Sequence, residues 1–171
     1  MKAAWIGVLE VSPLGPVWVA VTVHGLAEVD IATTRESFVQ SLHERGYSPV
    51  LVDQGRTAQA VEQLDEYLRG ERRAFDLAID WSVLTPFQQQ ALRLTSAIPY
   101  GQVRTYGEIA RQMGKPGAAR AVGRAEATNP MPLVIPCHRV LGSDGALHGY
   151  GAGEGLKTKE WLLSLEGSNF S

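Results

Sequence analysis

The sequence predicts an α+β protein with a small N-terminal α/β domain over residues 1–80 and a mainly helical C-terminal domain over residues 85–171 that contains a helix-turn-helix. Three observations support this prediction. Apolar residues alternate with a period of two near the N-terminus, whereas capped helical segments separated by glycine and proline follow Thr85. The 171 residues are 44% hydrophobic and 20% charged, which is typical of one or two globular domains and excludes disordered, collagen and coiled-coil chains.

The N-terminal domain is expected to combine a sheet with two helices. A helix should cover about residues 34–45, and Thr57 should cap a second helix that Gly70 ends. Alternating apolar residues predict antiparallel strands over residues 6–11, 17–23 and 26–31. His24 and His43 lack nearby cysteine or clustered carboxylates, so we interpret them as surface or turn histidines and the domain as a scaffold.

The C-terminal domain is expected to contain three capped helices before residue 130. Thr85 is a good N-cap residue, and Pro86 at the first helical position needs no N–H partner, so a helix should run to about residue 97. Thr105 should cap a shorter helix, and a third should cover about residues 118–127. Two short helices joined by a glycine-containing turn form a helix-turn-helix pattern, although many such hairpins bind nothing.

Charge is distributed unevenly along the chain. The net charge of −2 argues against a protein that coats nucleic acid, but residues 1–80 carry a net charge of −5 and residues 81–171 one of +3. Residues 101–125 have five basic side chains and one acidic side chain. A polyanion should therefore bind there, the alternative being a solvated helix face with a chance cluster of charges.

The predicted helix over residues 118–127 has two different faces. A small apolar stripe consists of Ala118, Ala121, Val122 and Ala125. The opposite face is basic and nearly free of bulk, with Arg120, Gly123, Arg124 and Ala127. A glycine inside a helix costs about 1 kcal/mol relative to alanine. Close approach to a DNA groove would offset that cost; the alternative is packing against a neighbouring helix.

One cysteine, Cys137, excludes an internal disulfide and a zinc site made of several thiolates. The longest apolar stretches are far shorter than a membrane span, and residues 1–11 lack the basic start of a signal peptide. We therefore expect a cytoplasmic protein without a membrane segment, a cofactor or a metal ion. Metal analysis that found stoichiometric zinc would contradict this expectation.

The segment from Asn129 to Val140 carries the strongest chemical signal. Its three prolines predict an extended, stiff backbone that ends in Cys137-His138. Successive side chains of an extended segment point apart, so a bridging water would have to pass a proton between the two. Glu166 is the candidate for orienting the imidazole. The alternative is a cysteine that serves only as a small buried apolar residue.

At this point the sequence resembles the O6-alkylguanine-DNA alkyltransferase family, whose active-site motif is similar to Pro136-Cys137-His138-Arg139-Val140. The resemblance densely covers residues 85–167, and the turn at residues 12–15 agrees with it. Other segments match the family's pattern in order and approximate spacing: Phe87-Gln88, Ile98-Pro99-Tyr100-Gly101, Thr105-Tyr106, Arg120-Ala121-Val122-Gly123, Asn129-Pro130, Gly149-Tyr150 and Lys159 to Glu166-Gly167.

The resemblance implies a DNA repair protein that moves the alkyl group from O6-alkylguanine, or from O4-alkylthymine, to its own cysteine, once per molecule. Its N-terminal domain would be ribonuclease H-like. Carried over by position, Cys137 would be the nucleophile, His138 the base acting through water, and Glu166 the residue that orients His138. Tyr106 would donate to N3 of the leaving guanine, and Asn129 would hold the segment with the thiol.

The resemblance also implies how DNA is bound. A monomer would place the helix over residues 118–127 in the minor groove of double-stranded DNA, and Arg120 would replace the flipped-out nucleotide. The remaining residues expected to contact DNA are Thr105, Ala119, Gly123 and Arg124, and those expected to line the base pocket are Tyr106, Val140, Tyr150 and Gly151.

Three features depart from the family's pattern. Arg124 and Glu126 occupy helix positions where the family more often has small or uncharged residues, and a carboxylate near phosphates would weaken DNA binding. The glycine-rich loop over residues 151–155 is longer than in many relatives, which suggests a pocket for groups larger than methyl. Comparing transfer rates from O6-methylguanine and O6-benzylguanine tests this suggestion.

Three other functions compete with this interpretation. An alkyltransferase-like protein that flags lesions without repairing them would lack the cysteine that this chain has. A helix-turn-helix regulator would need Gln, Asn or Ser on its recognition helix to read the major groove. A cysteine hydrolase would turn over repeatedly and would need an oxyanion hole, which the sequence does not reveal.

Overall fold

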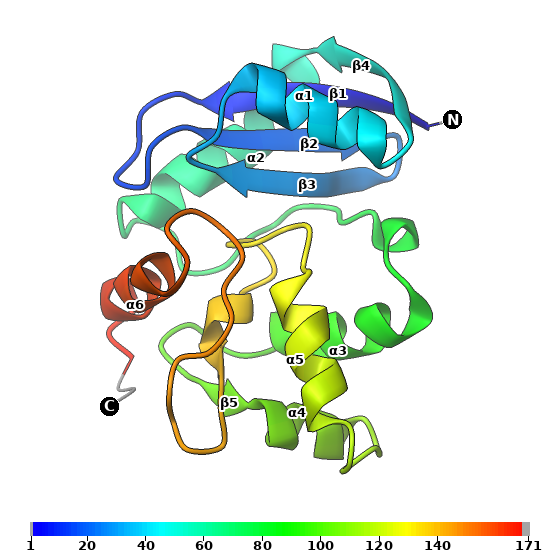
Figure 1. The fold of residues 1–171 in the computed structure, drawn as a ribbon. Helices are drawn as coiled ribbons and strands as arrows, with labels where there is room; N and C mark the ends of the chain where they lie inside the picture. The colour runs from blue at the N-terminus through cyan, green and yellow to red at the C-terminus, as the bar shows by residue number, and fades with distance from the viewer. Residues whose placement is uncertain (1, 169–171) are drawn as a thin grey trace. The chain divides into compact units, whose positions relative to one another are not determined.

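The computed structural model describes residues 2–168 and separates into two compact units, one ending at Val83 and the other beginning at Leu84 (Figure 1). The first unit is a small sheet with two helices, and the second is mainly helical. This architecture confirms the predicted fold class. Within the described residues, no helix combines the length and apolar character that crossing a membrane requires.

The N-terminal unit is built on a four-stranded sheet in the order β3-β2-β1-β4. The first three strands are antiparallel, as predicted, whereas β4 runs parallel to β1. The elements of this unit are β1 (Lys2–Leu9), β2 (Val17–Thr22), β3 (Gly25–Ile31), α1 (Arg35–Glu44), β4 (Tyr47–Val52), α2 (Gln54–Leu68) and the 3-10 helix η1 (Trp81–Val83).

The structure of this unit differs from the sequence-based prediction in three places. Strand β4 was not predicted: Pro49 lies inside it, and β4 is an edge strand, where a residue without an N–H group is tolerated. Thr57 does not cap α2; Asp53 does, since its side chain accepts a hydrogen bond from the Arg56 amide. Thr57 is instead buried one turn later against Gly7, where a Cβ atom would meet the threonine hydroxyl. The first strand also begins at Lys2 rather than at residue 6.

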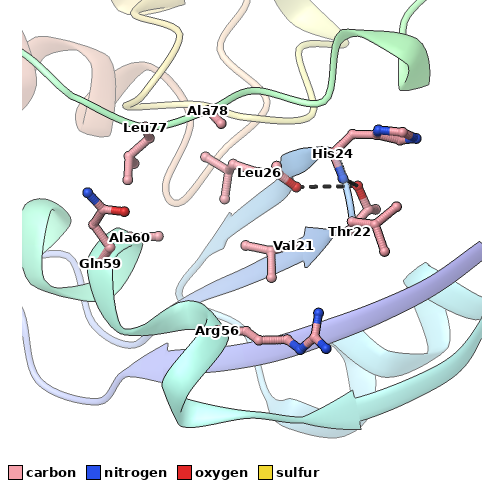
Figure 2. A pocket seen from close by; sticks show the side chains of 11 residues that line it. Val21, Thr22, His24, Leu26, Arg56, Gln59, Ala60, Leu77 and Ala78 are labelled. Carbon is pink, nitrogen blue, oxygen red and sulfur yellow. Dashed lines mark hydrogen bonds between the residues drawn. The ribbon is translucent and has the colours of Figure 1, made fainter.

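A pocket of about 290 Å³ lies between the turn that joins β2 to β3 and the side of α2 (Figure 2). His24, which is exposed as expected, is at its rim with Arg56 and Gln59. The residues that line the pocket include no cysteine and no carboxylate. The pocket thus holds no catalytic cysteine or acid, and the scaffold role of this unit stays a prediction.

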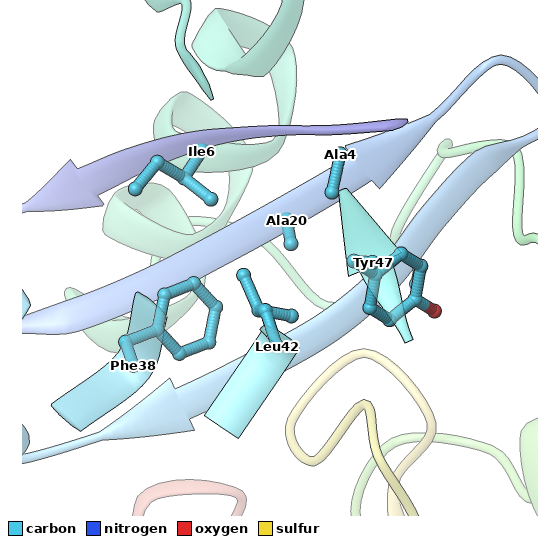
Figure 3. Packing of buried hydrophobic residues seen from close by; sticks show 7 residues of the cluster. Ala4, Ile6, Ala20, Phe38, Leu42 and Tyr47 are labelled. Carbon is cyan, nitrogen blue, oxygen red and sulfur yellow. The ribbon is translucent and has the colours of Figure 1, made fainter. Parts of the chain in front are cut away.

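The core of the N-terminal unit lies between the sheet and α1 (Figure 3). Ala4 and Ile6 of β1 point to this face, as the period of two predicts, and Phe38 and Leu42 of α1 pack against them. Trp5 and Gly7 alternate to the other face, where the Arg56 guanidinium lies 3.9 Å from the centre of the Trp5 ring. Both faces of β1 are thus covered by helices.

Residues 84–168 of the C-terminal unit form four α-helices, and the expected caps are present. Thr85 and Thr105 each form a capping box, with Gln88 and Glu108 respectively, and Pro86 is the first residue of its helix. The elements are α3 (Pro86–Ser96), β5 (Arg104–Thr105), α4 (Tyr106–Gln112), α5 (Ala119–Ala127), the 3-10 helix η2 (Cys137–Arg139), β6 (Val140–Leu141) and α6 (Leu156–Leu165).

Helices α4 and α5 lie side by side and form the helix-turn-helix (Figure 1). Val122 and Ala125 of α5 are buried, and Arg120 and Arg124 are exposed on the opposite side, as the pattern predicts. A Cβ atom at Gly123 would meet nothing within 4 Å. Packing against a neighbouring helix therefore does not explain this glycine within the unit.

Candidate active site

The segment before Cys137 folds into a compact, buried turn, which corrects the extended backbone expected from its prolines. Leu133 has a φ of 74°, and the Ile135 amide donates to the Met131 carbonyl at 2.9 Å. Asn129 closes the turn: its side chain accepts from the Met131 amide at 3.0 Å and donates to the Ile135 carbonyl at 2.9 Å. The prolines restrict φ but leave room for the single left-handed residue that bends the chain.

Cys137, His138 and Arg139 form the 3-10 turn η2, and all three side chains are buried. In a 3-10 helix, successive side chains diverge by about a third of a turn, rather than pointing to opposite sides as they would in a strand. The geometry assumed from an extended backbone is therefore wrong. Helix α6 packs against this turn.

Glu166, the C-cap residue of α6, binds both residues that follow the cysteine. His138 Nε2 lies 2.8 Å from one carboxylate oxygen of Glu166. Arg139 donates to both oxygens, from Nε and Nη2 at 2.8 Å each, and Nη1 donates to the Ile98 carbonyl at 2.7 Å. Such a bidentate guanidinium pair compensates the charge of a buried carboxylate, so we assign Glu166 as ionised.

Sequence reasoning missed Arg139, although it directly follows His138. Its charge changes what Glu166 does to the imidazole. The Glu166 carboxylate favours a protonated His138, but burial and the positive charges of Arg139 and Lys159 act in the other direction, and the net effect lowers the pKa of His138. The imidazole is therefore neutral at pH 7 and able to accept a proton.

The Cys137 thiol is 5% exposed, and burial raises its pKa to about 12. A negative charge on Glu126 also raises this pKa, while a hydrogen bond with Asn129 and the charge of Lys159 lower it. The sulfur is consequently a neutral thiol in the free protein at pH 7. A base must take its proton before or during attack on carbon.

Tyr106 lies at the start of α4, and the strand pair β5-β6 holds it near the reactive turn. Thr105 pairs with Leu141, two residues after Arg139. The Tyr106 hydroxyl donates to the His148 carbonyl at 3.1 Å, and burial raises its pKa to about 12. Tyr106 therefore keeps its proton at neutral pH and can act as a donor.

Lys159 is a second residue whose position the sequence did not explain. Its side chain is fully buried, and Nζ donates to the Val140 carbonyl at 2.8 Å and to the His148 carbonyl at 2.7 Å. Lys159 thus joins α6 to the reactive turn and to the loop that Tyr106 also binds. The available signal was a lysine three and four residues before Leu162 and Leu163, on the apolar side of α6.

The residues expected to line a base pocket gather around this turn. Val140 is fully buried, and Tyr150 is 7% exposed, with no hydrogen-bond partner for its hydroxyl within residues 2–168. Gly151 lies against the end of α5, where a Cβ atom would be 3.0 Å from the Ala127 carbonyl oxygen. The loop after β6 and the C-terminal end of α5 therefore meet near Cys137.

The expected DNA-contacting residues divide into two groups. Arg120 and Arg124 are exposed, whereas Ala119 and Gly123 are half-buried on the same helix. The half-buried Thr105 uses its hydroxyl to cap α4, accepting from the Glu108 amide at 3.1 Å. These residues form a surface on α4 and α5 apart from the buried network of Glu166.

The position of Glu126 contradicts the expectation that its carboxylate lies near DNA phosphates. It is 3% exposed and contacts the hydroxyl of Thr95 in α3, so its carboxyl faces the interior rather than a phosphate. The helix period explains the error, because position 126 lies beside Val122 and Ala125 on the packed side of α5. Within the part of the chain that the structure describes, no group of three or more His, Cys, Asp or Glu side chains could hold a metal ion.

Comparison with known proteins identifies relatives of both units. The 6-O-methylguanine DNA methyltransferase family matches twice: its DNA binding domain over residues 86–168 and its ribonuclease-like domain over residues 9–81. The chain is 43% identical over 155 residues to the methylated-DNA--protein-cysteine methyltransferase of Mycobacterium leprae, covering 91% of this chain and 88% of that protein.

The protein of the same name from Salmonella typhimurium is 38% identical over 159 residues, covering 91% of this chain and 92% of the relative. Among solved structures, that of Mycobacterium tuberculosis OGT in complex with DNA is similar, with a TM-score of 0.79 and 38% identity. This similarity covers 95% of this chain and 92% of the other.

Proposed function

The chain belongs to the 6-O-methylguanine DNA methyltransferase family, and on that premise we propose that Cys137 receives the alkyl group. The activity is DNA repair by transfer of an alkyl group from DNA to a protein cysteine. One observation carries the assignment of the acceptor. The single cysteine of the chain lies in a buried turn, directly before a histidine whose imidazole binds an arginine-clamped carboxylate.

The proposed transfer is a displacement at the alkyl carbon. A bond forms between this carbon and Cys137 Sγ, while the bond from the carbon to O6 of guanine breaks and its electrons go to the base. The thiol proton passes to His138, whose lowered pKa keeps it neutral beforehand. The imidazolium that results lies 2.8 Å from the Glu166 carboxylate, which stabilises the new positive charge.

The leaving guanine carries the negative charge of the broken bond. We assign Tyr106 as the donor to N3 of that base, since its raised pKa keeps the hydroxyl protonated. In the free protein this hydroxyl donates to the His148 carbonyl, and Lys159 donates to the same oxygen at 2.7 Å. Lys159 can therefore keep that carbonyl satisfied when Tyr106 turns to the base.

The protein binds DNA, and we propose that α5 enters the minor groove with Arg120 and Arg124 facing the duplex. The open space at Gly123 supports this orientation, because the backbone there can approach DNA closely. Reaching O6 requires the nucleotide to leave the stack, at a cost of a few kcal/mol, and Arg120 is placed to fill the gap. The cytoplasmic location and monomeric state stay predictions.

The product of the transfer is a thioether, whose carbon–sulfur bond water does not hydrolyse at neutral pH, so each molecule acts once. The test is peptide mass spectrometry after incubation with excess duplex that contains one O6-methylguanine, with Cys137→Ser as the control. We expect one methyl group on the Cys137 peptide and repair of one lesion per protein. Tight lesion binding with unmodified Cys137 would make the chain a damage sensor, and continued turnover would refute the assigned nucleophile.

A further inference from the structure

Glu126 is a buried carboxyl close to the reactive thiol, and it takes no part in the network of Glu166. Its electrostatic neighbours are Tyr106 of α4, Cys137 of η2 and Lys159 of α6. Its hydrogen-bond partner on α3 is an uncharged polar group, the fully buried hydroxyl of Thr95. A buried acid so close to a sulfur that must become negative requires a physical explanation.

The hydrogen bonds of Thr95 bear on the proton of Glu126. The Thr95 hydroxyl lies within hydrogen-bond distance of the Ala91 carbonyl oxygen, at 3.0 Å, and of Glu126 Oε1. A hydroxyl has one proton and a carbonyl oxygen has none, so Thr95 cannot donate in both contacts. If Thr95 donates to the Ala91 carbonyl, its contact with Glu126 becomes a full hydrogen bond when Glu126 is protonated and donates to the threonine oxygen.

The surroundings of the other carboxyl oxygen support the same charge state. Glu126 Oε2 is buried and has no hydrogen-bond partner within residues 2–168. Lys159, the nearby cation, donates hydrogen bonds to the carbonyls of Val140 and His148. An uncompensated buried carboxylate costs far more than a neutral acid, and burial accordingly raises the pKa of Glu126 to about 8.

We propose that Glu126 is a positioning residue for alkyl transfer: as a neutral acid it places no negative charge beside the developing Cys137 thiolate, and its ionisation at alkaline pH opposes formation of that thiolate. This inference rests on the proposed function of Cys137. An ordinary active-site thiol becomes more reactive as pH rises. In this protein the rise should weaken above about pH 8, because the carboxylate that forms there repels the thiolate.

The experiment compares wild-type protein with Glu126→Gln, which preserves size and a donor group but cannot ionise. Glu126→Met is a second variant without charge, and Glu160→Gln is the control, since Glu160 is an exposed acid on α6. Two rates are followed from pH 6.5 to pH 9.5 by mass spectrometry of the Cys137 peptide. One is transfer from the free base O6-benzylguanine, so that DNA affinity does not enter, and the other is alkylation by iodoacetamide.

At pH 6.5 we expect Glu126→Gln to react within about twofold of wild type by both measures, because the side chain at position 126 is uncharged in both proteins. At pH 9.5 both uncharged variants should react about tenfold faster than wild type, and Glu160→Gln should not differ from it. Lys159 also titrates near pH 8, so ratios between proteins at the same pH are compared.

Equal pH profiles for wild type and folded Glu126→Gln would overturn the proposal, and circular dichroism and the unfolding midpoint establish that the variants fold. If wild-type Cys137 takes no alkyl group from O6-benzylguanine, the proposed function fails instead. The iodoacetamide profiles still decide the role of Glu126 in that case, because they report the acidity of the thiol without any repair activity.

Discussion

Glu166 at the end of α6 and Glu126 near the end of α5 are both almost inaccessible to solvent, at 6% and 3% exposed. Glu166 receives two hydrogen bonds from the Arg139 guanidinium and lies 2.8 Å from His138 Nε2. Glu126 contacts one threonine hydroxyl, and its second oxygen has no hydrogen-bond partner among the described residues. Glu166 is hydrogen-bonded to a cation, whereas the hydrogen-bond partner of Glu126 is an uncharged hydroxyl.

The comparison shows that burial alone does not fix the charge of an acid. Removing a carboxylate from water is costly in both places, and only a hydrogen-bonded cation repays the cost at Glu166. At Glu126 the cheaper solution is to keep the proton. A buried glutamate can thus serve as an anion that stabilises an imidazolium, as at Glu166, or as an uncharged group near a thiol, as at Glu126.

The largest effect expected from this comparison follows Arg139→Ala. The substitution leaves the Glu166 carboxylate buried without its guanidinium, and breaking a buried ion pair costs about 3–5 kcal/mol. The free energy of unfolding from urea titrations at pH 7 measures this loss. In a Glu166→Gln background the same substitution should cost clearly less, and an equal cost in both backgrounds would mean that Arg139 does not compensate Glu166.

Glu126→Gln is expected to have a smaller, pH-dependent effect on the free energy of unfolding. The pKa of Glu126 is raised to about 8 in the folded protein, so the folded state binds more protons than the unfolded state between about pH 4.5 and pH 8. Wild-type stability should therefore fall as pH rises through this window, by about 1.4 kcal/mol per pH unit from this group at most.

Urea titrations at pH 5, 7 and 9 check this sign. Glu126→Gln should be close to wild type at pH 5 and the more stable protein at pH 9. Glu28 also has a pKa raised by burial, to about 7, but it is present in both proteins and its contribution cancels. A stability difference that is constant from pH 5 to pH 9 would contradict the raised pKa of Glu126.

The smallest effect concerns which charges of α5 reach DNA. Arg124 is exposed and Glu126 is buried, so Arg124→Ala should make the negative slope of log K against log salt concentration less steep by about 0.9, the value for one phosphate contact. Glu126→Gln should leave this slope unchanged at pH 7. Fluorescence anisotropy with a labelled duplex at several salt concentrations measures both, and a changed slope for Glu126→Gln would place its charge near phosphates.

Local signals carried much of the fold. Thr85, Pro86 and Thr105 start their helices as predicted, because caps depend on a few neighbouring residues. Local signals also failed in identifiable ways. Asp53 and Thr57 are both acceptable N-cap residues, and the close packing of Thr57 on Gly7 decided between them. Pro49 argues against a strand in the sequence, and only the order of the strands in the sheet shows that β4 lies at the edge, where proline is tolerated.

The sequence by itself determined the single cysteine, the histidine and arginine that follow it, and the amphipathic helix with two exposed arginines. Those features depend on residue identity and short spacing, which a sequence records directly. Only the tertiary structure decided that Arg139 clamps Glu166, that Lys159 joins two carbonyls, and that Glu126 is buried within electrostatic reach of the thiol. The charge of a buried group depends on partners that are distant in the chain, and these partners become neighbours only when the helices pack.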